Sequence, residues 1–575
     1  MKNYFSLLKQ IFLIIPKEYS KKLKLIFFAL SIAGVLEALG IGLLIPLISE
    51  ILNDDSHYLI KDYLSIFFEL NKIELIQFLS VSIFLLYLFK SVYLTKLEFF
   101  IQKFTQNIKA DLTLQLFNKY TNNSYEFNVN NNSSILLRNL TSEVSNFSAG
   151  LLRPAIMFAK EFFIVVLLLV MLLTINFKIS LLIIIFSILF ILIVQNYSVK
   201  ILKKLGKSEQ SIKGQENKII IETLQGIKFI KSYNVENIYN LRLNQLLKKF
   251  VIIKSKSNAI KLLPRIWIEL FLFLFLIFLG FGFKFFNLTL INFVTFSSVF
   301  LITMLKVMPS LISAIKVLNV LSNYKASIDL ISSEFIEDVQ NFRKNTILKD
   351  INIKSVKEFE IKNIFFSYSN SKNVIEGLSL KIKTENDFIG IYGDSGSGKT
   401  TLVDILIGLL KPTKGHYELD GNIIDNNLLK NFFGYIPQNT FLFDDTIRNN
   451  ILITNRFPEN LIGEKFKEIL KITQLNELVE TLPDKENTLI GENGSRISGG
   501  QKQRISIARA LMSDPKVLIF DEATSGLDKN TEDKIFENLK IISKTNSIIV
   551  ISHNPNLRRY CNTIYELSEK KLIKL

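Results

Sequence analysis

The chain has 575 residues, of which 49% are hydrophobic and 48 are phenylalanine. This composition excludes a chain made only of soluble domains and indicates a large membrane portion. The formal net charge of +17 would suit nucleic-acid binding, but no basic patch interleaved with aromatic residues stands out. The anionic inner leaflet of a membrane explains the charge more simply, so we expect no nucleic-acid partner.

Six segments in the first 320 residues are long and apolar enough to cross a bilayer as helices. A spanning helix needs about 20 apolar residues, and residues 180–194 and 270–283 carry no charge. Several segments exceed this length and border long polar connections, so we expect helices that continue into the cytoplasm. The predicted spans are residues 23–52, 73–100, 144–175, 177–201, 262–286 and 291–320.

The distribution of basic residues predicts the orientation of these spans. The connection 200–261 holds fourteen lysines or arginines, whereas the segment after the first span offers only Lys61 and Lys72. By the positive-inside rule, the N-terminus, the long connections and the C-terminal domain face the cytoplasm. Residues 1–16 fit an interfacial helix better than a signal peptide. Residues 58–70 fit a short external helix or a solvated loop equally well.

Charged residues inside the predicted spans are candidates for contact with a transported molecule. Each costs about 2.5 to 3.5 kcal/mol at a helix centre, so it is usually kept for use or for pairing. At 1.5 Å per residue, Lys90, Arg265 and Lys306 reach a similar depth in the inner half of the membrane, where they would suit an anionic headgroup. Alternatively, they snorkel to the lipid headgroups or pair with acids. The charged set is Glu37, Lys90, Arg153, Lys160, Glu161, Arg265, Glu269 and Lys306.

The run GDSGSGKT, residues 393–400, predicts a phosphate-binding loop in the C-terminal domain. Its backbone N–H groups would cradle phosphate oxygens, Lys399 would reach the terminal phosphates, and the Thr400 hydroxyl would meet Mg²⁺. Residues 388–392 read as a buried strand and residues 401–410 as a helix, which is the context that this motif requires. We therefore expect ATP and Mg²⁺ as ligands.

Two further motifs follow at suitable distances. RISGGQKQR, residues 496–504, opens a helix for which Ser498 suits the N-cap, so the helix start offers an anion site. VLIFDE, residues 517–522, reads as a buried strand at whose end Asp521 can hold Mg²⁺ and Glu522 can polarise the attacking water. Taken singly, the first could be an ordinary capped helix and the second merely the start of a helix.

These motifs, in this order, resemble those of ATP-binding cassette (ABC) proteins across the whole nucleotide domain. The resemblance implies that Tyr368 stacks on adenine, that Gln438 senses the γ-phosphate and meets Mg²⁺, and that His553 is the switch histidine. It also implies that residues 525–528 face a partner subunit and that residues 491–492 form the loop before the signature. Ile497 and Gly526 stand where leucine and alanine are commoner in the family.

The candidate site residues follow from the motifs and the resemblance together. Catalytic roles are expected for Glu522, His553 and Gln438, metal binding for Thr400, Gln438 and Asp521, and substrate binding for Lys90, Arg265 and Lys306. The expected ATP-binding residues are Tyr368, Gly393, Asp394, Ser395, Gly396, Ser397, Gly398, Lys399, Thr400, Thr401, Ser498, Gly499, Gly500 and Gln501.

The same resemblance predicts a homodimer. A phosphate loop and a signature helix on one domain belong to different ATP sites, so each ATP would lie between residues 393–400 of one chain and residues 498–501 of another. Exporter-type members of the family couple through short cytoplasmic helices, expected here near residues 131–140 and 216–226. The expected fold is thus an α-helical polytopic membrane domain of exporter type with six spans, residues 1–320, a linker, 321–357, and an α/β P-loop cassette domain, 358–575.

The membrane half also resembles the PglK-type flippases of lipid-linked oligosaccharides. The resemblance is carried by LLPRIWIE at 262–269, KVMPS at 306–310 and YLFKS around Lys90. It implies ATP-driven movement of a polyprenyl-pyrophosphate-linked oligosaccharide to the outer leaflet of the bacterial inner membrane. Those flippases have arginine where this chain has Lys90 and Lys306, and lysine keeps the charge but loses the bidentate fork.

Other functions remain open at this stage. An exporter of the same architecture could carry a lipid A-like lipid, a peptide or a drug. A peptidase-linked peptide exporter is disfavoured because the only cysteine is Cys561, near the C-terminus. A scaffold without transport activity would be expected to have lost catalytic residues, whereas Lys399, Glu522 and His553 are all present.

Overall fold

The computed structural model describes residues 14–44, 72–175, 211–282, 331–334, 355–368, 373–523, 528–552 and 555–575, with isolated positions between 45 and 313. The chain divides into two compact units. The first comprises residues 1–122 and 132–345, and the second comprises residues 123–131 and 346–575. Each unit is described by itself.

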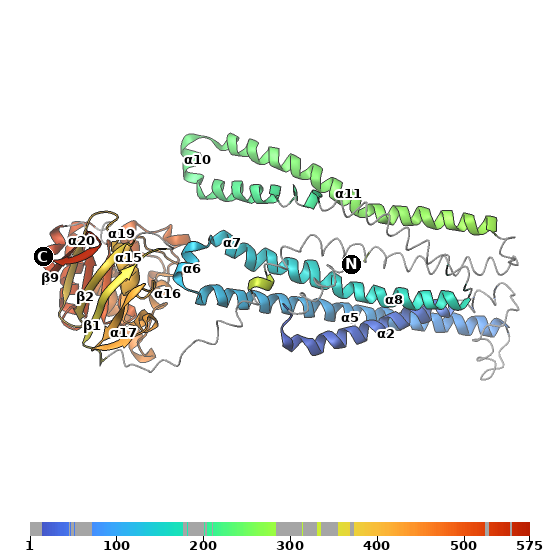
Figure 1. The fold of residues 1–575 in the computed structure, drawn as a ribbon, viewed down its shortest axis with the longest axis horizontal. Helices are drawn as coiled ribbons and strands as arrows, with labels where there is room; N and C mark the ends of the chain where they lie inside the picture. Colours follow the sequence, from blue (N-terminus) through green and yellow to red (C-terminus); the bar gives the residue numbers. More distant parts are fainter. Residues whose placement is uncertain are drawn as a thin grey trace. The chain divides into compact units, whose positions relative to one another are not determined.

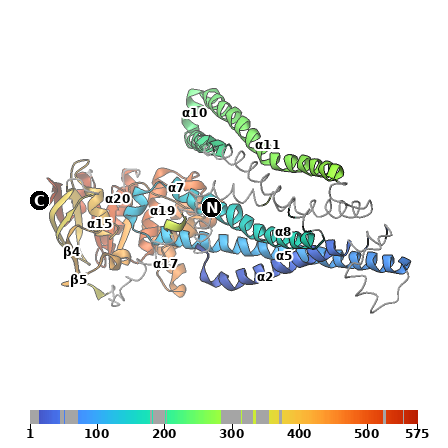
Figure 2. The same cartoon turned by 45° about the vertical axis from the view of Figure 1, so that its right-hand side comes forward.

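Three long helices of the first unit lie side by side: α2 (Ser20–Gly42), α5 (Lys72–Asn122) and α8 (Arg153–Ile175) (Figures 1 and 2). Glycines allow α2 to pack closely on both neighbours. A Cβ on Gly34 would lie 3.4 Å from Phe163 of α8, and a Cβ on Gly40 would lie 3.1 Å from the Tyr87 ring of α5. In the described part of the chain, the helical stretches Lys17–Gly40 and Ile73–Asn122 are long and apolar enough to span a membrane.

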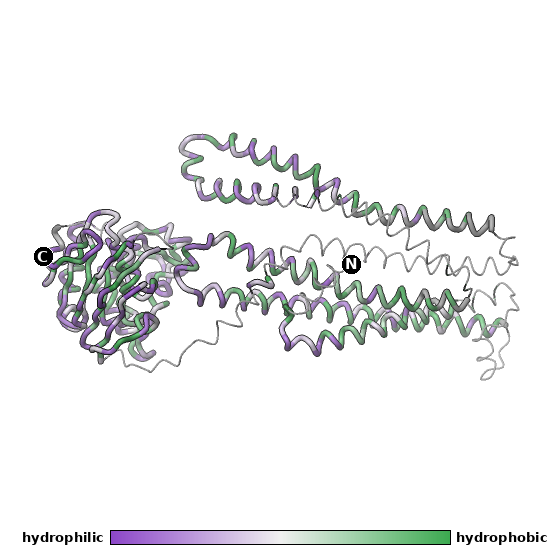
Figure 3. The backbone as a smooth tube through the Cα atoms, viewed as in Figure 1, coloured by the Kyte–Doolittle hydropathy of each residue, from purple (hydrophilic) through white to green (hydrophobic). Residues whose placement is uncertain are grey.

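Helix α5 is much longer than a bilayer is thick. Its 51 residues correspond to about 77 Å at 1.5 Å per residue, against about 30 Å of hydrocarbon. Helix α11 (Glu236–Gly282) has 47 residues. Figure 3 shows that the hydrophobic residues of both helices concentrate in one half and the polar residues in the other. Both helices are therefore longer than a bilayer is thick, as the sequence predicts.

Several predictions for the membrane half fall on residues outside the described ones. These are most of the spans at 177–201 and 291–320, the external segment 58–70, and most of the linker 321–357. The span predicted at 144–175 is only partly α-helical. Two π-helical segments, η2 (Asn139–Glu143) and η3 (Asn146–Leu152), precede α8. Pro154 contributes to this, because it lacks the N–H that an α-helix would direct at the Gly150 carbonyl.

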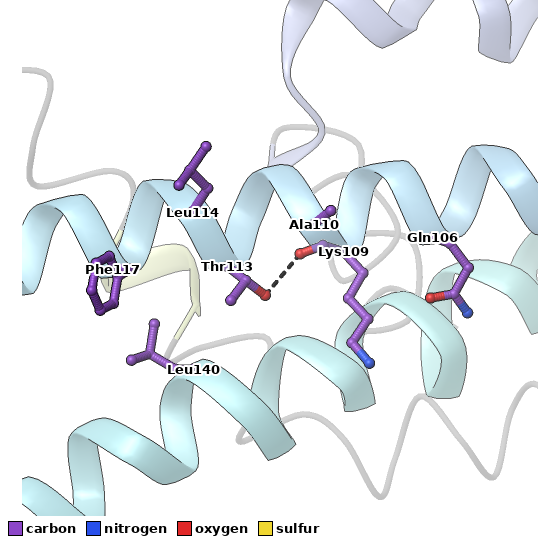
Figure 4. A pocket seen from close by; sticks show the side chains of 7 residues that line it. All are labelled: Gln106, Lys109, Ala110, Thr113, Leu114, Phe117 and Leu140. Carbon is purple, nitrogen blue, oxygen red and sulfur yellow. Dashed lines mark hydrogen bonds between the residues drawn. The ribbon is translucent and has the colours of Figure 1, made fainter. Parts of the chain in front are cut away.

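An open groove of about 470 Å³ lies between α5 and η2 (Figure 4). It belongs to the first unit and is lined by Gln106, Lys109, Ala110, Thr113, Leu114 and Phe117 of α5 and Leu140 of η2. The Thr113 hydroxyl bonds back to the Lys109 carbonyl oxygen at 2.9 Å, so it is satisfied within its own helix.

The structure has short helices at or near both segments predicted to couple the domains. Helix α7 (Ser133–Arg138) lies within the first predicted segment, and α6 (Tyr125–Asn130) precedes it; residues 123–131 group with the second unit and residues from 132 onward with the first. Helix α6 begins at Tyr125 because the Ser124 side chain caps it, accepting from the Phe127 N–H at 3.3 Å. Near the second predicted segment lies α10 (Ile227–Tyr233); residues 216–225 instead end the preceding helix.

The second unit contains two sheets. A four-stranded antiparallel sheet has the order β2-β1-β4-β5, and a six-stranded sheet has the order β10-β9-β3-β8-β7-β6. In the latter every pairing is parallel except that of β10 with β9. The strands are β1 (Glu358–Phe366), β2 (Ile375–Lys383), β3 (Phe388–Tyr392), β4 (Lys414–Leu419), β5 (Asn422–Ile424), β6 (Phe433–Ile436), β7 (Val517–Asp521), β8 (Ser547–Ile551), β9 (Thr563–Ser568) and β10 (Lys571–Lys574).

Helices complete this unit. Those at the motifs are α15 (Lys399–Leu406), which packs into the core between the sheets, and α19 (Gly499–Met512), which shares a separate core with α16 and α17. Helix α15 ends before the predicted residue 410 because Gly408, at φ +76°, turns the chain. The other helices are α16 (Ile447–Leu452), α17 (Glu459–Ile472), α18 (Asn476–Thr481) and α20 (Lys529–Ile542).

The strands that carry the motifs are confirmed. All five residues of β3 and all five of β7 are buried; the apolar residues predict this, and Asp521 at the end of β7 is buried with them. The two strands lie on either side of β8, with the same chain direction. Their carboxyl ends therefore reach one edge of the sheet, which is where open α/β sheets bind their ligands.

Candidate functional site

The loop between β3 and α15 has the backbone that phosphate binding requires. A Cβ on Gly393 would lie 2.7 Å from the Leu567 carbonyl oxygen, so only glycine fits there. Gly398 adopts φ +100°, which side-chain-bearing residues rarely adopt, and α15 starts directly after it. The N–H groups of the first turn of α15 thus follow the loop, where an anion is favoured by the helix dipole.

Lys399 is folded into this loop. Its side chain is 7% exposed, and its Nζ donates to the carbonyl oxygens of Gly393 and Asp394, each at 2.9 Å. A Glu522 oxygen lies 3.8 Å from the same nitrogen. In the described part of the chain, the buried Ser397 hydroxyl has no hydrogen-bond partner. A phosphate group would supply an acceptor both to this hydroxyl and to the ammonium group.

The end of β7 presents two consecutive carboxylates in different environments. Asp521 is 6% exposed, and one of its oxygens accepts from the Tyr435 hydroxyl at 3.2 Å. Glu522 has φ +49°, and one of its oxygens accepts from the Gln438 amide nitrogen at 2.8 Å. A left-handed backbone is rare for glutamate and is typically retained at functional sites. The turn aims the Glu522 side chain at Lys399 and Gln438.

The oxygen donors at this edge fit Mg²⁺, which prefers carboxylate, hydroxyl and amide oxygens. Thr400 has an exposed side chain next to Lys399, Asp521 ends β7, and Gln438 reaches Glu522. Burial is the main cause that raises the pKa of Asp521, the charge of Glu522 raises it further, and the Tyr435 hydroxyl lowers it. A divalent cation would relieve this crowding of negative charge.

Tyr368 lies beside the same loop. Its hydroxyl is 3.1 Å from the Thr401 hydroxyl of α15, and its ring meets the Phe366 ring edge-on at 4.9 Å between centroids. The side chain is 39% exposed, so one ring face can receive an adenine base. The structure therefore places this predicted adenine contact next to the phosphate loop.

The signature residues form the start of α19. Ser498 is the N-cap: its hydroxyl accepts from the Gln501 N–H at 3.3 Å, and its own N–H donates to the Gln501 side chain at 2.8 Å. This reciprocal pair is a capping box. A Cβ on Gly499 would meet no atom within 4 Å. The N-cap prediction is confirmed, and the helix start is open to an approaching anion.

Some predicted site residues lie outside the described ones. These are His553 and residues 525–527 of the loop expected to face a partner. Asp528, the last residue of that loop, is described and caps α20, accepting from the Thr531 N–H at 3.0 Å. On the membrane side, Lys306 is outside the described residues, and of Arg265 only the backbone, within α11, is described.

Lys90 is paired within the first unit. Its Nζ lies 2.5 Å from a Glu37 oxygen of α2 and 4.5 Å from the centre of the Tyr87 ring. The side chains of Lys90 and Glu37 are 7% and 9% exposed. The predicted cation ring is thus described only at Lys90, where the structure shows the pairing with an acid that the sequence left as the alternative.

Three residues near these sites were not singled out from the sequence. Tyr435 bonds to Asp521 because β6 pairs with β7 in parallel, which a sequence pattern does not reveal. Glu37 was noted as charged, but its partner depends on how α2 packs on α5. Asp404, four residues after Thr400 on α15, is 9% exposed; its helical spacing from the motif is a signal that could have found it.

Comparisons with known proteins agree with this geometry. Residues 25–307 match the family model of the ABC transporter transmembrane region, and residues 375–525 match the ABC transporter model. A solved structure described as a bacterial Atm1-family ABC exporter with ATP bound superposes with a TM-score of 0.73. The superposition covers 97% of this chain and 95% of the exporter chain. The sequence identity is 18%, so the likeness shows the fold alone.

The curated relatives differ in how much of their length matches this chain. The ATP-dependent lipid A-core flippase of Desulfotalea psychrophila is 25% identical over 525 residues, 90% of each chain. The lactococcin-G-processing and transport ATP-binding protein of Lactococcus lactis is 31% identical over 384 residues, 64% of this chain and 52% of that protein. Six other relatives match over only 35% to 49% of their own length.

Two family models and one whole-chain structural match thus agree with the phosphate loop, the β7 carboxylates and the capped signature helix. The chain belongs to the ABC exporters, as a half-transporter in which one transmembrane exporter domain is fused to one ATP-binding cassette domain.

Proposed function

We propose that two copies of this chain form an ATP-driven flippase of the bacterial inner membrane. Its cargo is a polyprenyl-pyrophosphate-linked oligosaccharide, moved from the inner to the outer leaflet. The position of Glu522 is the main support for ATP hydrolysis by this chain. Its carboxylate lies between Lys399 and Gln438, beside the phosphate loop. A site without catalytic function would have no reason to keep this strained carboxylate beside the loop lysine.

In this proposal each residue of the site has a separate task. Residues 393–401 bind the phosphates, and Tyr368 stacks on the base. When ATP binds, its γ-phosphate takes the Lys399 ammonium from the two loop carbonyls that now hold it. Glu522 then accepts a hydrogen bond from the attacking water and orients it, with Gln438 and His553 on either side. Mg²⁺ held by Thr400, Asp521 and Gln438 would neutralise charge on the phosphates.

The second half of each ATP site comes from the partner copy. Ser498 and the glycines after it present an open helix start, which supplies N–H groups and a positive dipole end to the γ-phosphate. Because one chain carries both a phosphate loop and a signature, a homodimer has two complete sites. Closing and opening of this pair drive the membrane helices.

The cargo assignment is supported by the motifs around Lys90, Arg265 and Lys306. Three cations at one depth in the inner half of the membrane, six in a dimer, favour a pyrophosphate headgroup over a neutral one. In the described conformation Lys90 is held by Glu37, so binding of the headgroup requires the lysine to exchange that carboxylate for phosphate.

One observation favours a second cargo. The lipid A-core flippase of Desulfotalea psychrophila matches over 90% of both chains, which is a wider match than that of the bacteriocin exporters. A lipid A-like glycolipid also carries phosphate on a lipid headgroup, so the same cations would serve it.

Reconstitution into vesicles tests the proposal directly. The full-length chain is placed in liposomes with a fluorescent lipid-linked oligosaccharide, a lipid A-like glycolipid or a peptide, and outer-leaflet appearance is measured with and without MgATP. We expect ATP-dependent movement of the pyrophosphate-linked oligosaccharide, abolished by Glu522→Gln. Movement of the lipid A-like glycolipid alone would replace the cargo assignment, and movement of the peptide alone would refute a flippase function.

A further inference from the structure

The chain passes between its two compact units at three places. The crossings follow Asn122, Asn131 and Asn345. A movement that ATP produces in the second unit pulls on the first unit through each of these connections. Residues of the first unit that bind the three connections to one another are therefore candidates for coupling ATP hydrolysis to movement of the membrane helices.

One polar cluster of the first unit takes a residue from beside each crossing. Lys119 and Tyr120 lie in the last turn of α5, just before the first crossing. Asn139 begins η2, shortly after the second crossing. Glu334 lies in the short helix 331–334, drawn in yellow beside α5 in Figure 1, before the third crossing.

Tyr120 is at the centre of this cluster. Its hydroxyl donates to one carboxylate oxygen of Glu334 at 3.3 Å and accepts from the Asn139 side-chain amide at 3.2 Å. The Lys119 Nζ lies 2.8 Å from the other carboxylate oxygen of Glu334 and donates to the Glu334 carbonyl oxygen at 2.6 Å. One hydroxyl and one ammonium group thus join α5, η2 and the helix 331–334.

The cluster is buried. Tyr120 is 5% exposed and Asn139 is 4% exposed, and Ile331, one turn before Glu334, is fully buried. Hydrogen bonds shielded from water in this way are costly to break. An apolar cluster would hold the three segments at least as firmly, because buried ion pairs seldom add stability over well-packed apolar residues. Stability alone therefore does not explain why these polar groups meet here.

The position of the cluster along α5 gives it a mechanical consequence. Tyr120 lies about 70 Å along this helix at 1.5 Å per residue, well beyond the stretch that about 30 Å of hydrocarbon can cover. Helix α5 is continuous from Lys72 to Asn122, and Lys90 joins it to α2 through Glu37. A displacement of its Tyr120 end is therefore carried along the helix to the predicted span.

We propose that Tyr120 is a positioning residue that couples ATP hydrolysis to movement of α5: its hydroxyl, held between Asn139 and Glu334, makes the three connections move together. Without this link, a pull on one connection is absorbed by the segment that receives it, and α5 is displaced less. The inference rests on the proposed ATP-driven function and is independent of the cargo.

Two measurements on the full-length chain in lipid nanodiscs test the proposal. Cys561→Ser removes the only cysteine, and Ile73→Cys then places one spin label per chain near the start of α5. The distance between the two labels of a dimer is measured without nucleotide and after MgATP is trapped with vanadate. In Tyr120→Phe we expect the ratio of shifted to unshifted distances to fall about tenfold, the scale of one hydrogen bond to a charged group. The steady-state ATPase rate of the same preparation should change less than about twofold, because Tyr120 is outside the nucleotide unit.

A second variant and a matched control separate coupling from a structural role. Glu334→Gln removes the charge that holds Lys119 and should weaken the response to trapping in the same way. Combined with Tyr120→Phe, it should be no worse than the worse single variant, because both changes break one link. The control is Tyr93→Phe, which removes a hydroxyl of the same helix that donates to the Ala29 carbonyl oxygen at 2.8 Å and should keep the full response.

The outcomes are distinct. A full response in Tyr120→Phe and Glu334→Gln would overturn the inference, and so would an equal loss in Tyr93→Phe. A labelled chain that hydrolysed ATP without any change of distance on trapping would overturn it too. Melting temperatures that agree among the variants would show that a lost response does not come from unfolding. A chain that hydrolysed no ATP would instead refute the proposed function.

Discussion

The backbone conformation of Glu522 determines where its side chain lies. The left-handed conformation at the end of β7 turns its side chain away from Asp521 and toward Gln438, which donates to it at 2.8 Å. The Lys399 ammonium, at 3.8 Å, places a positive charge beside this carboxylate. Two adjacent carboxylates are thereby assigned different tasks by their surroundings.

The change Glu522→Gln tests that assignment. The amide keeps the size of the side chain and can still meet Lys399 and Gln438, so ATP binding should be retained. It cannot accept a proton from water, so the hydrolysis rate should fall at least about 100-fold. Nucleotide affinity and phosphate release are measured on the same preparation.

The matched control is Glu566→Gln, an exposed glutamate of β9 in the same domain, which should hydrolyse ATP at the original rate. A Glu522→Gln protein that released phosphate as fast as the control would show that another group orients the water.

At the scale of elements, the Glu37–Lys90 pair joins α2 to α5. Both side chains are more than nine-tenths buried, and Lys90 also lies against the Tyr87 ring, on which Gly40 of α2 packs. Breaking a buried ion pair by removing one partner leaves an uncompensated charge and costs about 3 to 5 kcal/mol, whereas removing both is often neutral.

Comparing single and double variants measures how much the Glu37–Lys90 pair contributes to stability. Lys90→Met and Glu37→Gln should each lower the melting temperature of the full-length chain by several degrees, and the combined variant should regain most of the loss. Thermal unfolding in detergent at one protein concentration provides the comparison. If the combined variant melted at or below the worse single variant, α2 and α5 would not depend on this pair.

Helices and strands whose residues form one continuous sequence pattern could be predicted from the sequence. Strands β3 and β7 are short, buried and bounded by motifs, and β7 is apolar up to Asp521; Ser498 precedes its helix with Gln501 in the capping-box position. Features that depend on a partner far along the chain could not. The Tyr435–Asp521 bond requires the pairing of β6 with β7, and the Glu37–Lys90 pair requires the packing of α2 on α5.

In two places, local residues produce helical segments that neither the family resemblance nor the hydropathy pattern predicted. The first coupling helix is expected at 131–140, where α7 (Ser133–Arg138) lies, and the cap at Ser124 adds a further short helix, α6, that begins at Tyr125. The apolar run from residue 144 suggested one span, yet the chain is π-helical up to Leu152, where Pro154 withholds a backbone donor. In both places one residue sets the local helix geometry: the Ser124 side chain caps α6, and Pro154 lacks a backbone N–H.

At the scale of the whole molecule, we propose that each ATP site is made by two chains. The phosphate loop follows β3 beside the core between the sheets, whereas the signature starts α19 in a separate helical core of the same domain. Lys399 and Glu522 converge on the loop, and Ser498 presents an open helix start. If two chains complete each site in this way, ATP would join the two copies, and its binding energy could move the membrane helices.

Complementation between two defective chains tests that claim most directly. One chain carries Lys399→Ala and keeps its signature, the other carries Ser498→Arg and keeps its phosphate loop, and both carry Glu522→Gln to stop turnover. Two different affinity tags isolate the mixed dimers, and trapped ATP is measured. We predict one trapped ATP per mixed dimer and none in either dimer of identical chains. Mixed dimers without trapped ATP, or equal trapping by the Ser498→Arg chain alone, would contradict the account.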